Sequence, residues 1–289
     1  MPQSLTRLAC IVLVCTLSAC DIFNREEMAP GFIHISRADL VTNEAVEGAP
    51  THDIVDVHVF ANEDFVGSYE LPATIAILEN GPTRISINAG IKNSGALLRR
   101  VIYPFYAPLN IEKDLLPGVV LPVREDSTAV FNYFPNAYNF VFEDFESIGN
   151  AFVSGENSDA EVQAQNAVVR SGELSGQISL SSGTPYFFST LDWELANIPR
   201  GIIAYLEIDF KGNNPLEIGI QRGGPTGPKF FLIGLNPREE WTKVYIDLSR
   251  TLGQNVGTLP FTFYFESQLL PENSSAEMYV DNVKFVYPK

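Results

Sequence analysis

Apolar and polar residues alternate with a period of two along most of this chain. Residues 205–210 read Tyr-Leu-Glu-Ile-Asp-Phe, residues 261–266 read Phe-Thr-Phe-Tyr-Phe-Glu, and a similar alternation runs through 55–60. Successive side chains of a β-strand point to opposite faces, so this period predicts strands with one buried face. Turn residues such as the Glu-Asn-Gly-Pro of 79–82 recur at short spacing, and no stretch carries a convincing helical period. We therefore predict an all-β chain.

The chain is long enough for two domains. It has 289 residues, which exceeds the usual single domain, and its hydrophobic content of 45% is sufficient for sizeable cores. A stretch between 115 and 139, rich in proline, asparagine and aromatic residues, separates two blocks of strand signals. We place a small β-domain at 32–125, a linker at 126–139 and a larger β-domain at 140–289.

Charge and cysteine content narrow the classes of function. The net charge of −16 argues against a nucleic-acid partner, because phosphate binding needs a basic surface. The same acidity is compatible with binding of divalent cations. The three cysteines, Cys10, Cys15 and Cys20, all lie near the N-terminus, so the rest of the chain can form no disulfide, zinc–thiolate site or cysteine nucleophile.

The N-terminal segment has the layout of a secretory signal. One positive residue, Arg7, precedes an apolar run over 8–17 that is too short to span a bilayer. The Leu-Ser-Ala-Cys sequence that ends at Cys20 resembles the lipobox of bacterial lipoproteins. The resemblance implies removal of residues 1–19 and acylation of Cys20, with residues 20–31 as cysteine and tether. An ordinary cleaved signal peptide with a chance cysteine is the alternative.

The tether is acidic, with Arg25-Glu26-Glu27 a few residues after the cysteine. Acidic residues at this place resemble the surface-export signal of lipoproteins in the Bacteroidetes group. The two resemblances imply an outer-membrane location, attachment through lipid alone, and exposure on the periplasmic or the cell-surface face.

Part of the first domain resembles a module of bacterial surface proteins. Within 57–91, Gly67, Pro72 and Gly81 stand at offsets similar to those of the PEGA-type β-sandwich repeat. The resemblance implies a small immunoglobulin-like or PEGA-like sandwich that serves as a spacer or an interaction module. The aromatic segment 103–108 is interpreted as an edge strand packed against this sandwich, and an exposed patch for a protein partner is the alternative.

The second domain carries four motifs in a recognisable order. They are Phe-Glu-Asp-Phe-Glu at 142–146, a segment rich in serine and glycine at 171–180, a strand opened by Trp at 241–248, and Tyr-Val-Asp-Asn-Val-Lys-Phe at 279–285. Together they resemble the galactose-binding-like jelly roll of many carbohydrate-binding modules. The resemblance implies a β jelly-roll sandwich, a fold that hosts many functions.

Groups with catalytic potential are few. The histidines, His34, His52 and His58, fall in the first domain without the spacing of a metal pair or a triad. The sequence has no nucleophile elbow and no phosphate loop. Carboxylate pairs that could cleave a glycosidic bond are Asp192 with Glu194, Glu207 with Asp209, and Glu239 with Glu240. Such pairs arise freely on the solvated strands of an acidic chain, so we expect no enzyme, and a glycan-cleaving enzyme is one alternative.

Aromatic residues of the second domain favour a binding function. A sugar ring stacks its C–H face on an exposed Trp or Tyr while polar neighbours contact its hydroxyls. Trp193 lies between two acids, Tyr186 lies just upstream, and Tyr205 falls on the polar side of its strand. These three are the predicted glycan-binding residues. Trp193 is equally compatible with core packing, and Trp241 is interpreted as a core residue. The alternative partner is a protein, with this chain as a structural or adhesive subunit of an envelope assembly.

Two slips in the alternation indicate a metal site. The apolar parity shifts by one residue at 143–144 in the first strand of the jelly roll and at 281–282 in its last strand. A β-bulge produces such a shift, and the acidic and amide oxygens at both points are ligands that Ca²⁺ prefers. The jelly-roll resemblance implies a structural Ca²⁺ bound by Asp144, Glu146 and Asp281. Solvated acids at strand ends are the alternative.

The lipobox generates a first prediction. Replacing Cys20 by serine removes the acylated thiol, and with it the roughly 0.8 kcal/mol per buried CH₂ that acyl chains contribute to membrane binding. We expect the parent protein in the membrane fraction of the producing cells and the Cys20→Ser variant in the soluble fraction. Equal membrane association of both forms would show that Cys20 is not the anchor.

Overall fold

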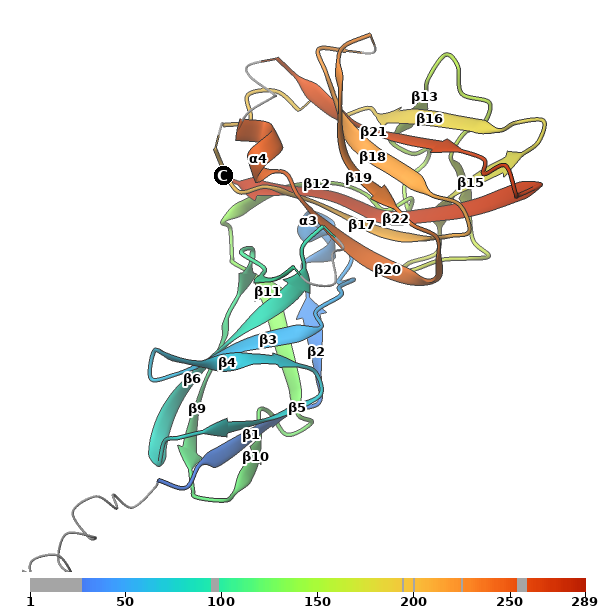
Figure 1. The fold of residues 1–289 in the computed structure, drawn as a ribbon. Helices are drawn as coiled ribbons and strands as arrows, with labels where there is room; N and C mark the ends of the chain where they lie inside the picture. The colour runs from blue at the N-terminus through green and yellow to red at the C-terminus, as the bar shows by residue number, and fades with distance from the viewer. Residues whose placement is uncertain (1–27, 95–98, 194, 200, 225, 254–258) are drawn as a thin grey trace, which may run out of the picture.

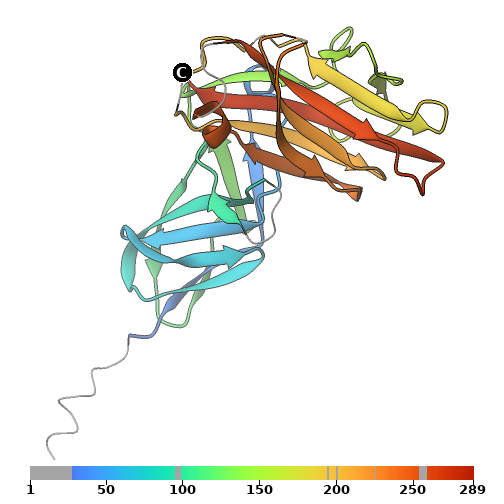
Figure 2. The same cartoon turned by 45° about the horizontal axis from the view of Figure 1, so that its top comes forward.

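The computed structural model describes residues 28–289 except 95–98, 194, 200, 225 and 254–258, so Cys20 lies outside the described residues. The described chain is almost entirely β, as the alternation predicts. Figures 1 and 2 show two β-domains joined end to end, with the first strand beginning at the end of the first domain that is remote from the second. Among the described residues, no helix is long and apolar enough to cross a membrane.

The first domain is built from short strands around one core. Its strands are β1 (Gly31–Ile35), β2 (Arg37–Val41), β3 (Asp56–Ala61), β4 (Asp64–Glu70), β5 (Ala73–Ile77), β6 (Gly81–Lys92), β7 (Arg100–Ile102), β8 (Tyr106–Ala107), β9 (Leu109–Leu115), β10 (Val120–Pro122) and β11 (Thr128–Tyr133), with the short helix α3 (Glu44–Glu47) after β2. They form the sheets β10-β1-β5, β2-β11-β8 and β4-β3-β6, and β7 and β9 also pair with β6. Alternate residues of all three sheets, such as Ile33, Phe131 and Ile87, are buried in the shared core.

The boundary between the domains differs from the predicted linker at 126–139. β11 runs parallel to β2 and pairs with β8, so it is an integral strand of the first domain. β12 (Tyr138–Glu143) already pairs with β22 (Ser275–Pro288) of the second domain. The connection therefore spans only residues 134–137. Proline and asparagine mark this short turn, whereas the residues before it alternate and pair as a strand.

The second domain is a sandwich of two sheets, as the jelly-roll resemblance implies. Its further elements are β13 (Phe152–Ser154), β14 (Gln163–Gln165), β15 (Ser175–Ser181), β16 (Tyr186–Leu191), β17 (Tyr205–Gly212), β18 (Leu216–Arg222), β19 (Lys229–Leu235), β20 (Arg238–Asp247), α4 (Ser249–Thr251) and β21 (Phe261–Gln268). One sheet has the order β14-β15-β22-β17-β20, with β12 also on β22, and the other has the order β13-β16-β21-β18-β19. Phe187, Ile208, Phe263 and Phe285 are buried between them. The first and last strands of the domain lie side by side.

The predicted slip in the last strand is a β-bulge. From Glu207 to Asp209 β17 advances two residues, while its partner β22 goes from Lys284 to Asp281, which is three. Asn282 takes up the extra residue with a φ of 47°. The other predicted slip, at 143–144, marks the end of β12. The bulge lets apolar residues on both sides of it face the same core.

Aromatic rings from both domains form a continuous interface. Tyr205 and Tyr245 of the second domain are buried in the same cluster as the core of the first. The ring of Tyr103 lies 5.1 Å from that of Tyr205 and 4.9 Å from that of Tyr245, and Phe105 lies 4.6 Å from Tyr138. The prediction of a packed edge strand at 103–108 is confirmed for β8 alone, because residues 104–105 form a turn. The alternative of an exposed patch is wrong, because the rings of Tyr103, Phe105 and Tyr106 are buried.

This interface predicts that the two domains stabilise each other. Tyr245→Ala removes a buried ring from the core of the first domain, so we expect a loss of about 3–5 kcal/mol in the free energy of unfolding. Hydrogen exchange at Ile85 and Ile87 of β6, in the first domain, reports whether that domain is destabilised as well. Ile203→Ala, at a residue that is 49% exposed, is the control and should cost far less. Unchanged protection in β6 would contradict a shared core.

Candidate functional site

One sheet of the jelly roll carries aromatic and hydrogen-bonding side chains on the face that points away from the core. In β16, Phe187 and Leu191 point into the core, so Tyr186, Phe188 and Thr190 point outward. Their cross-strand neighbours complete what we call the outer face: Val153, Glu217, Gly219, Gln221, Lys229, Phe231, Thr262, Tyr264 and Glu266.

Rings and charges pack together in the middle of the outer face. The Nζ of Lys229 lies 3.7 Å from the ring centroid of Phe188 and 5.2 Å from that of Tyr264. The same ammonium lies 3.1 Å from Oε2 of Glu266, whose Oε1 accepts a hydrogen bond of 2.7 Å from the hydroxyl of Tyr186. Burial, and after it the Glu266 carboxylate, raise the pKa of Tyr186, so its hydroxyl stays protonated as a donor.

Gly219 allows an aromatic ring of the outer face to lie close to the backbone. A Cβ at Gly219 would overlap the ring of Tyr264, which therefore lies directly against the backbone of β18. Beside it on β19, Phe231 is 60% exposed. On the outer face Tyr264 is thus buried against the backbone, whereas Phe231 exposes its aromatic ring to solvent.

A pocket of about 450 Å³ lies at one end of the outer face. Trp193 lines it together with Thr190, Gln221 and Thr262 of the outer face. Trp193 is half-buried and meets the core ring of Phe263 edge-on, with 6.4 Å between the centroids. It packs on the core and also lines the pocket, so core packing is confirmed and glycan binding by this residue stays a prediction. The volume is in the range of small-ligand sites.

Tyr186 and Tyr205, the other two predicted glycan-binding residues, do not line this pocket. Tyr186 pairs with Gln268 at the far end of β16, whereas Thr190 near the opposite end lines the pocket. The prediction for Tyr205 is wrong, since it is 4% exposed and packs on Tyr103 in the domain interface. Tyr205 does lie on the polar side of its strand, but the first domain covers that side.

The predicted calcium ligands are not assembled into a site. Asp281 is buried and accepts hydrogen bonds from the amides of Arg170 and Ser171 at 3.1 and 3.3 Å. Glu146 is exposed and accepts from the amides of Glu173 and Leu174 in the same loop, and Asp144 accepts from the Glu146 amide. No group of three acidic, histidine or cysteine side chains in the described ranges could hold a metal ion. The carboxylates of Asp281 and Glu146 thus both accept backbone amides of the loop at 170–174.

Buried charges lie where the jelly roll meets the first domain. Lys243 is fully buried, with its Nζ 3.3 Å from Asp209 Oδ2 and 3.6 Å from Glu207 Oε2. The first domain adds three hydrogen bonds to the carboxylates, one of them from Tyr133, which donates to Glu207 at 2.9 Å. Thr51 donates to Asp209 at 2.6 Å, and Tyr103 donates to Glu207 at 2.6 Å. Burial, and after it the Glu207 charge, raise the pKa of Tyr103, which keeps this donor protonated.

A fourth charged group enters the same cluster from β22. Lys284 is buried, and its Nζ lies 3.3 Å from the hydroxyl of Tyr133. Burial lowers the pKa of Lys284 to about 8, against the opposing effect of Glu207. The Glu207–Asp209 pair, which the sequence offers as a catalytic pair, is therefore closed off from substrate and neutralised by lysines.

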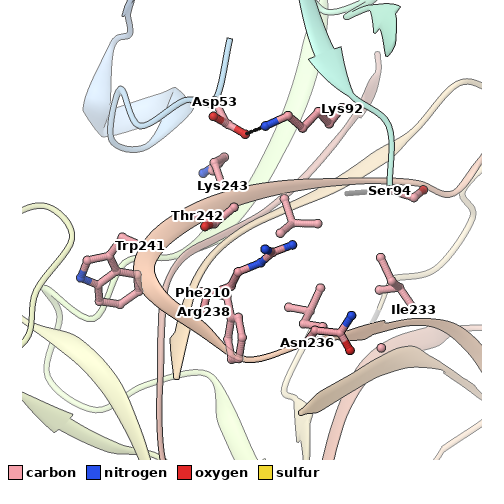
Figure 3. A pocket seen from close by; sticks show the side chains of 13 residues that line it. Asp53, Lys92, Ser94, Phe210, Ile233, Asn236, Arg238, Trp241, Thr242 and Lys243 are labelled. Carbon is pink, nitrogen blue, oxygen red and sulfur yellow. Dashed lines mark ion pairs between the residues drawn. The ribbon is translucent and has the colours of Figure 1, made fainter. Parts of the chain in front are cut away.

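A second pocket, of about 380 Å³, lies between the domains (Figure 3). β20 contributes Arg238 and Trp241, and the first domain contributes Lys92 and Asp53, which form an ion pair of 3.6 Å. Trp241 is half-buried and lines this pocket, so its interpretation as a core residue is wrong. It begins an alternating strand, but that strand is at the edge of its sheet.

Several residues of the outer face are not predicted as site residues by the sequence. Phe188 could have been found from its parity, which is opposite to that of the core residue Phe187. Lys229 and Phe231 follow a loop of glycine and proline, and Glu266 is one acid among many. The pairing of β16 with β21 places Glu266 opposite Phe188, and the pairing of β18 with both β21 and β19 brings Lys229 and Phe231 to the same face.

No protein-family model matches the sequence, and the comparison with curated proteins gives no match. Similar solved structures include a family 30 carbohydrate-binding module of a cellulosomal cellulase of Clostridium thermocellum, with 15% identity and a TM-score of 0.40 over 50% of this chain and 96% of that one. A family 29 carbohydrate-binding module complexed with cellulohexaose has 13% identity and a TM-score of 0.35 over 52% of this chain and 92% of that one. At these sequence identities and TM-scores, the residues of the site cannot be inferred from the similar structures.

The buried charges generate a stability prediction. Lys243→Ala leaves the carboxylates of Glu207 and Asp209 buried without their ammonium partner, so we expect a loss of about 3–5 kcal/mol in the free energy of unfolding by urea. Lys211→Ala is the matched control, because Lys211 lies on β17 and forms no ion pair with any described residue. A loss below about 1 kcal/mol for Lys243→Ala would contradict the role of its ammonium in compensating the two acids.

Proposed function

We propose that this chain is a lipid-anchored envelope protein whose jelly roll binds glycan without cleaving it. The observation that carries the proposal is the outer face, where aromatic rings stand beside hydrogen-bonding side chains and lead to the Trp193 pocket. Sugar recognition needs this combination, because the C–H faces of a sugar are apolar and its hydroxyls are polar. The lipobox that ends at Cys20 supports attachment to the outer membrane, on its periplasmic or its cell-surface face.

The geometry suggests how a chain of sugars would bind. One unit in the pocket contacts Trp193, with its hydroxyls near Thr190 and Gln221. The following units continue along the outer face, over Phe231. Lys229 and Glu266 offer a donor and an acceptor to hydroxyls of these units, since neither is fully buried. The two ends of the binding surface are thus the pocket and the region of Tyr186.

The two alternatives depend on other features. An adhesive subunit that binds protein through the aromatic segment 103–108 lacks an exposed patch there, because these rings are buried in the domain interface. A glycan-cleaving enzyme needs an accessible carboxylate pair. Glu207 and Asp209 are fully buried, Glu239 and Glu240 are exposed, and Glu194 lies outside the described residues, so its pairing with Asp192 stays a prediction. The accessible aromatic side chains favour glycan binding.

The site is tested by truncating Trp193. Trp193→Ala removes the ring from the pocket, and we expect affinity for the glycan selected on a broad panel to fall about tenfold, which is ~1.4 kcal/mol. Calorimetry measures the affinity, and a melting curve checks that the domain stays folded. Phe231→Ala, at an exposed ring, should weaken binding with no effect on folding.

Trp241→Ala is the matched control for a tryptophan in a pocket. Trp241 lines the interdomain pocket, so its loss should leave affinity unchanged. If Trp241→Ala weakens binding and Trp193→Ala does not, the glycan occupies the interdomain pocket instead. If the parent protein binds no glycan on the panel, the proposed function is wrong.

A further inference from the structure

The end of the first domain that is remote from the jelly roll exposes a cluster of apolar side chains. Of the fifteen large apolar residues exposed among the described residues, five lie where β1 begins, and the other ten are spread over both domains. The five are Met28, Leu78, Leu116, Val119 and Val120, and we call them the apolar tip. Figures 1 and 2 place the start of β1 and its neighbour β10 at this end of the molecule.

Backbone contacts hold the apolar tip together. The amide of Gly118 donates to the carbonyl of Pro30 at 2.8 Å, and the amide of Phe32 donates to the carbonyl of Val119 at 2.9 Å. Leu78 directly follows the β5 residue that pairs with the first residue of β1. The tip residues therefore surround the point at which the described chain enters the first domain.

The apolar residues of the tip flank an ordinary turn. Pro117 and Gly118 form the centre of the connection from β9 to β10, as is usual in turns, and Leu116, Val119 and Val120 on either side of them are exposed. Leu78 is 67% exposed. A group of exposed apolar side chains on a soluble domain marks a surface that another apolar phase covers.

The position of Cys20 identifies that phase. Cys20 lies eight residues before Met28, and a chain of eight residues spans at most about 28 Å. We propose that the apolar tip inserts into the surface of the bilayer that holds the acyl chains, an inference that rests on the proposed acylation of Cys20. The net charge of −16 argues against attraction to anionic lipid, so the contact is apolar.

Insertion of the tip orients the whole molecule. β6 begins at Gly81, whose partner Leu115 adjoins the tip, and it ends at Lys92 in the interdomain pocket. Its 12 residues correspond to roughly 37 Å at the rise of an antiparallel strand. The first domain then stands on the membrane as a spacer, and the outer face of the jelly roll is kept clear of the lipid.

Single cysteines test this orientation, because the mature chain has no other unmodified thiol once Cys20 is acylated. Val120→Cys, in the tip, and Glu272→Cys, on an exposed turn of the jelly roll, are each labelled with an environment-sensitive fluorophore in the lipidated full-length protein. In zwitterionic vesicles we expect the emission from position 120 to shift to shorter wavelength and to be quenched by brominated acyl chains. The emission from position 272 should not change.

The outcomes of this experiment distinguish insertion of the apolar tip from acylation of Cys20. A protein that floats with the vesicles but shows no shift at position 120 overturns the tip proposal and leaves acylation standing. A protein that does not float overturns both. A shift at position 120 without vesicles shows that a second copy covers the tip, which also overturns the proposal. Adding Leu78→Glu and Leu116→Glu should abolish the shift while flotation persists, and a shift that survives both changes contradicts insertion.

Discussion

The ion pairs that Lys243 makes with Glu207 and Asp209 are the constraint on which the arrangement of the two domains depends. Burying three charges is unfavourable unless each finds partners of good geometry. The jelly roll supplies the lysine, and the first domain supplies the hydroxyls of Thr51 and Tyr103. The first domain therefore completes the hydrogen bonding of acids that belong to the second. Loss of the first domain would leave the ion pairs but remove the hydroxyl donors of the two carboxylates.

This shared interface has a consequence for the binding surface. Part of the sheet that contains Tyr205 and Lys243 faces the first domain, whereas the outer face of the opposite sheet faces solvent. Trp241 and Tyr279 of the partly covered sheet are half-buried and pack on each other, with 6.4 Å between their ring centroids. The aromatic residues of the proposed binding surface, Phe188 and Phe231, lie on the opposite sheet.

Local sequence patterns predict most of the strands but few of the residues of the candidate site. Period-two alternation is a property of neighbours in the sequence, so the strands and the bulge at Asn282 could be inferred directly. Burial by a second domain is not local, so the polar parity of Tyr205 predicts a surface residue where the structure buries it. Composition marks turns better than it marks strand ends, so the predicted linker is longer than the connection at 134–137.

The predicted metal site shows a different limit. Carboxylates at strand ends look alike in sequence whether they bind a cation or accept amide hydrogen bonds. Asp281 and Glu146 accept backbone amides, and those donors come from a distant loop that no local pattern connects to them. Trp193 could be proposed because its acidic neighbours are unusual for a core residue, and that argument uses adjacent residues only.

The pairing of β22 constrains the order in which the jelly roll can form. This strand pairs with β12, β15 and β17, and all three precede it in the chain. During synthesis or export the sheet stays incomplete, with the edges of β15 and β17 uncovered, until residues 275–288 have emerged. The second domain thus completes this sheet only once β22 is available, rather than strand by strand, and until then the edges of β15 and β17 that β22 later covers can pair with other chains.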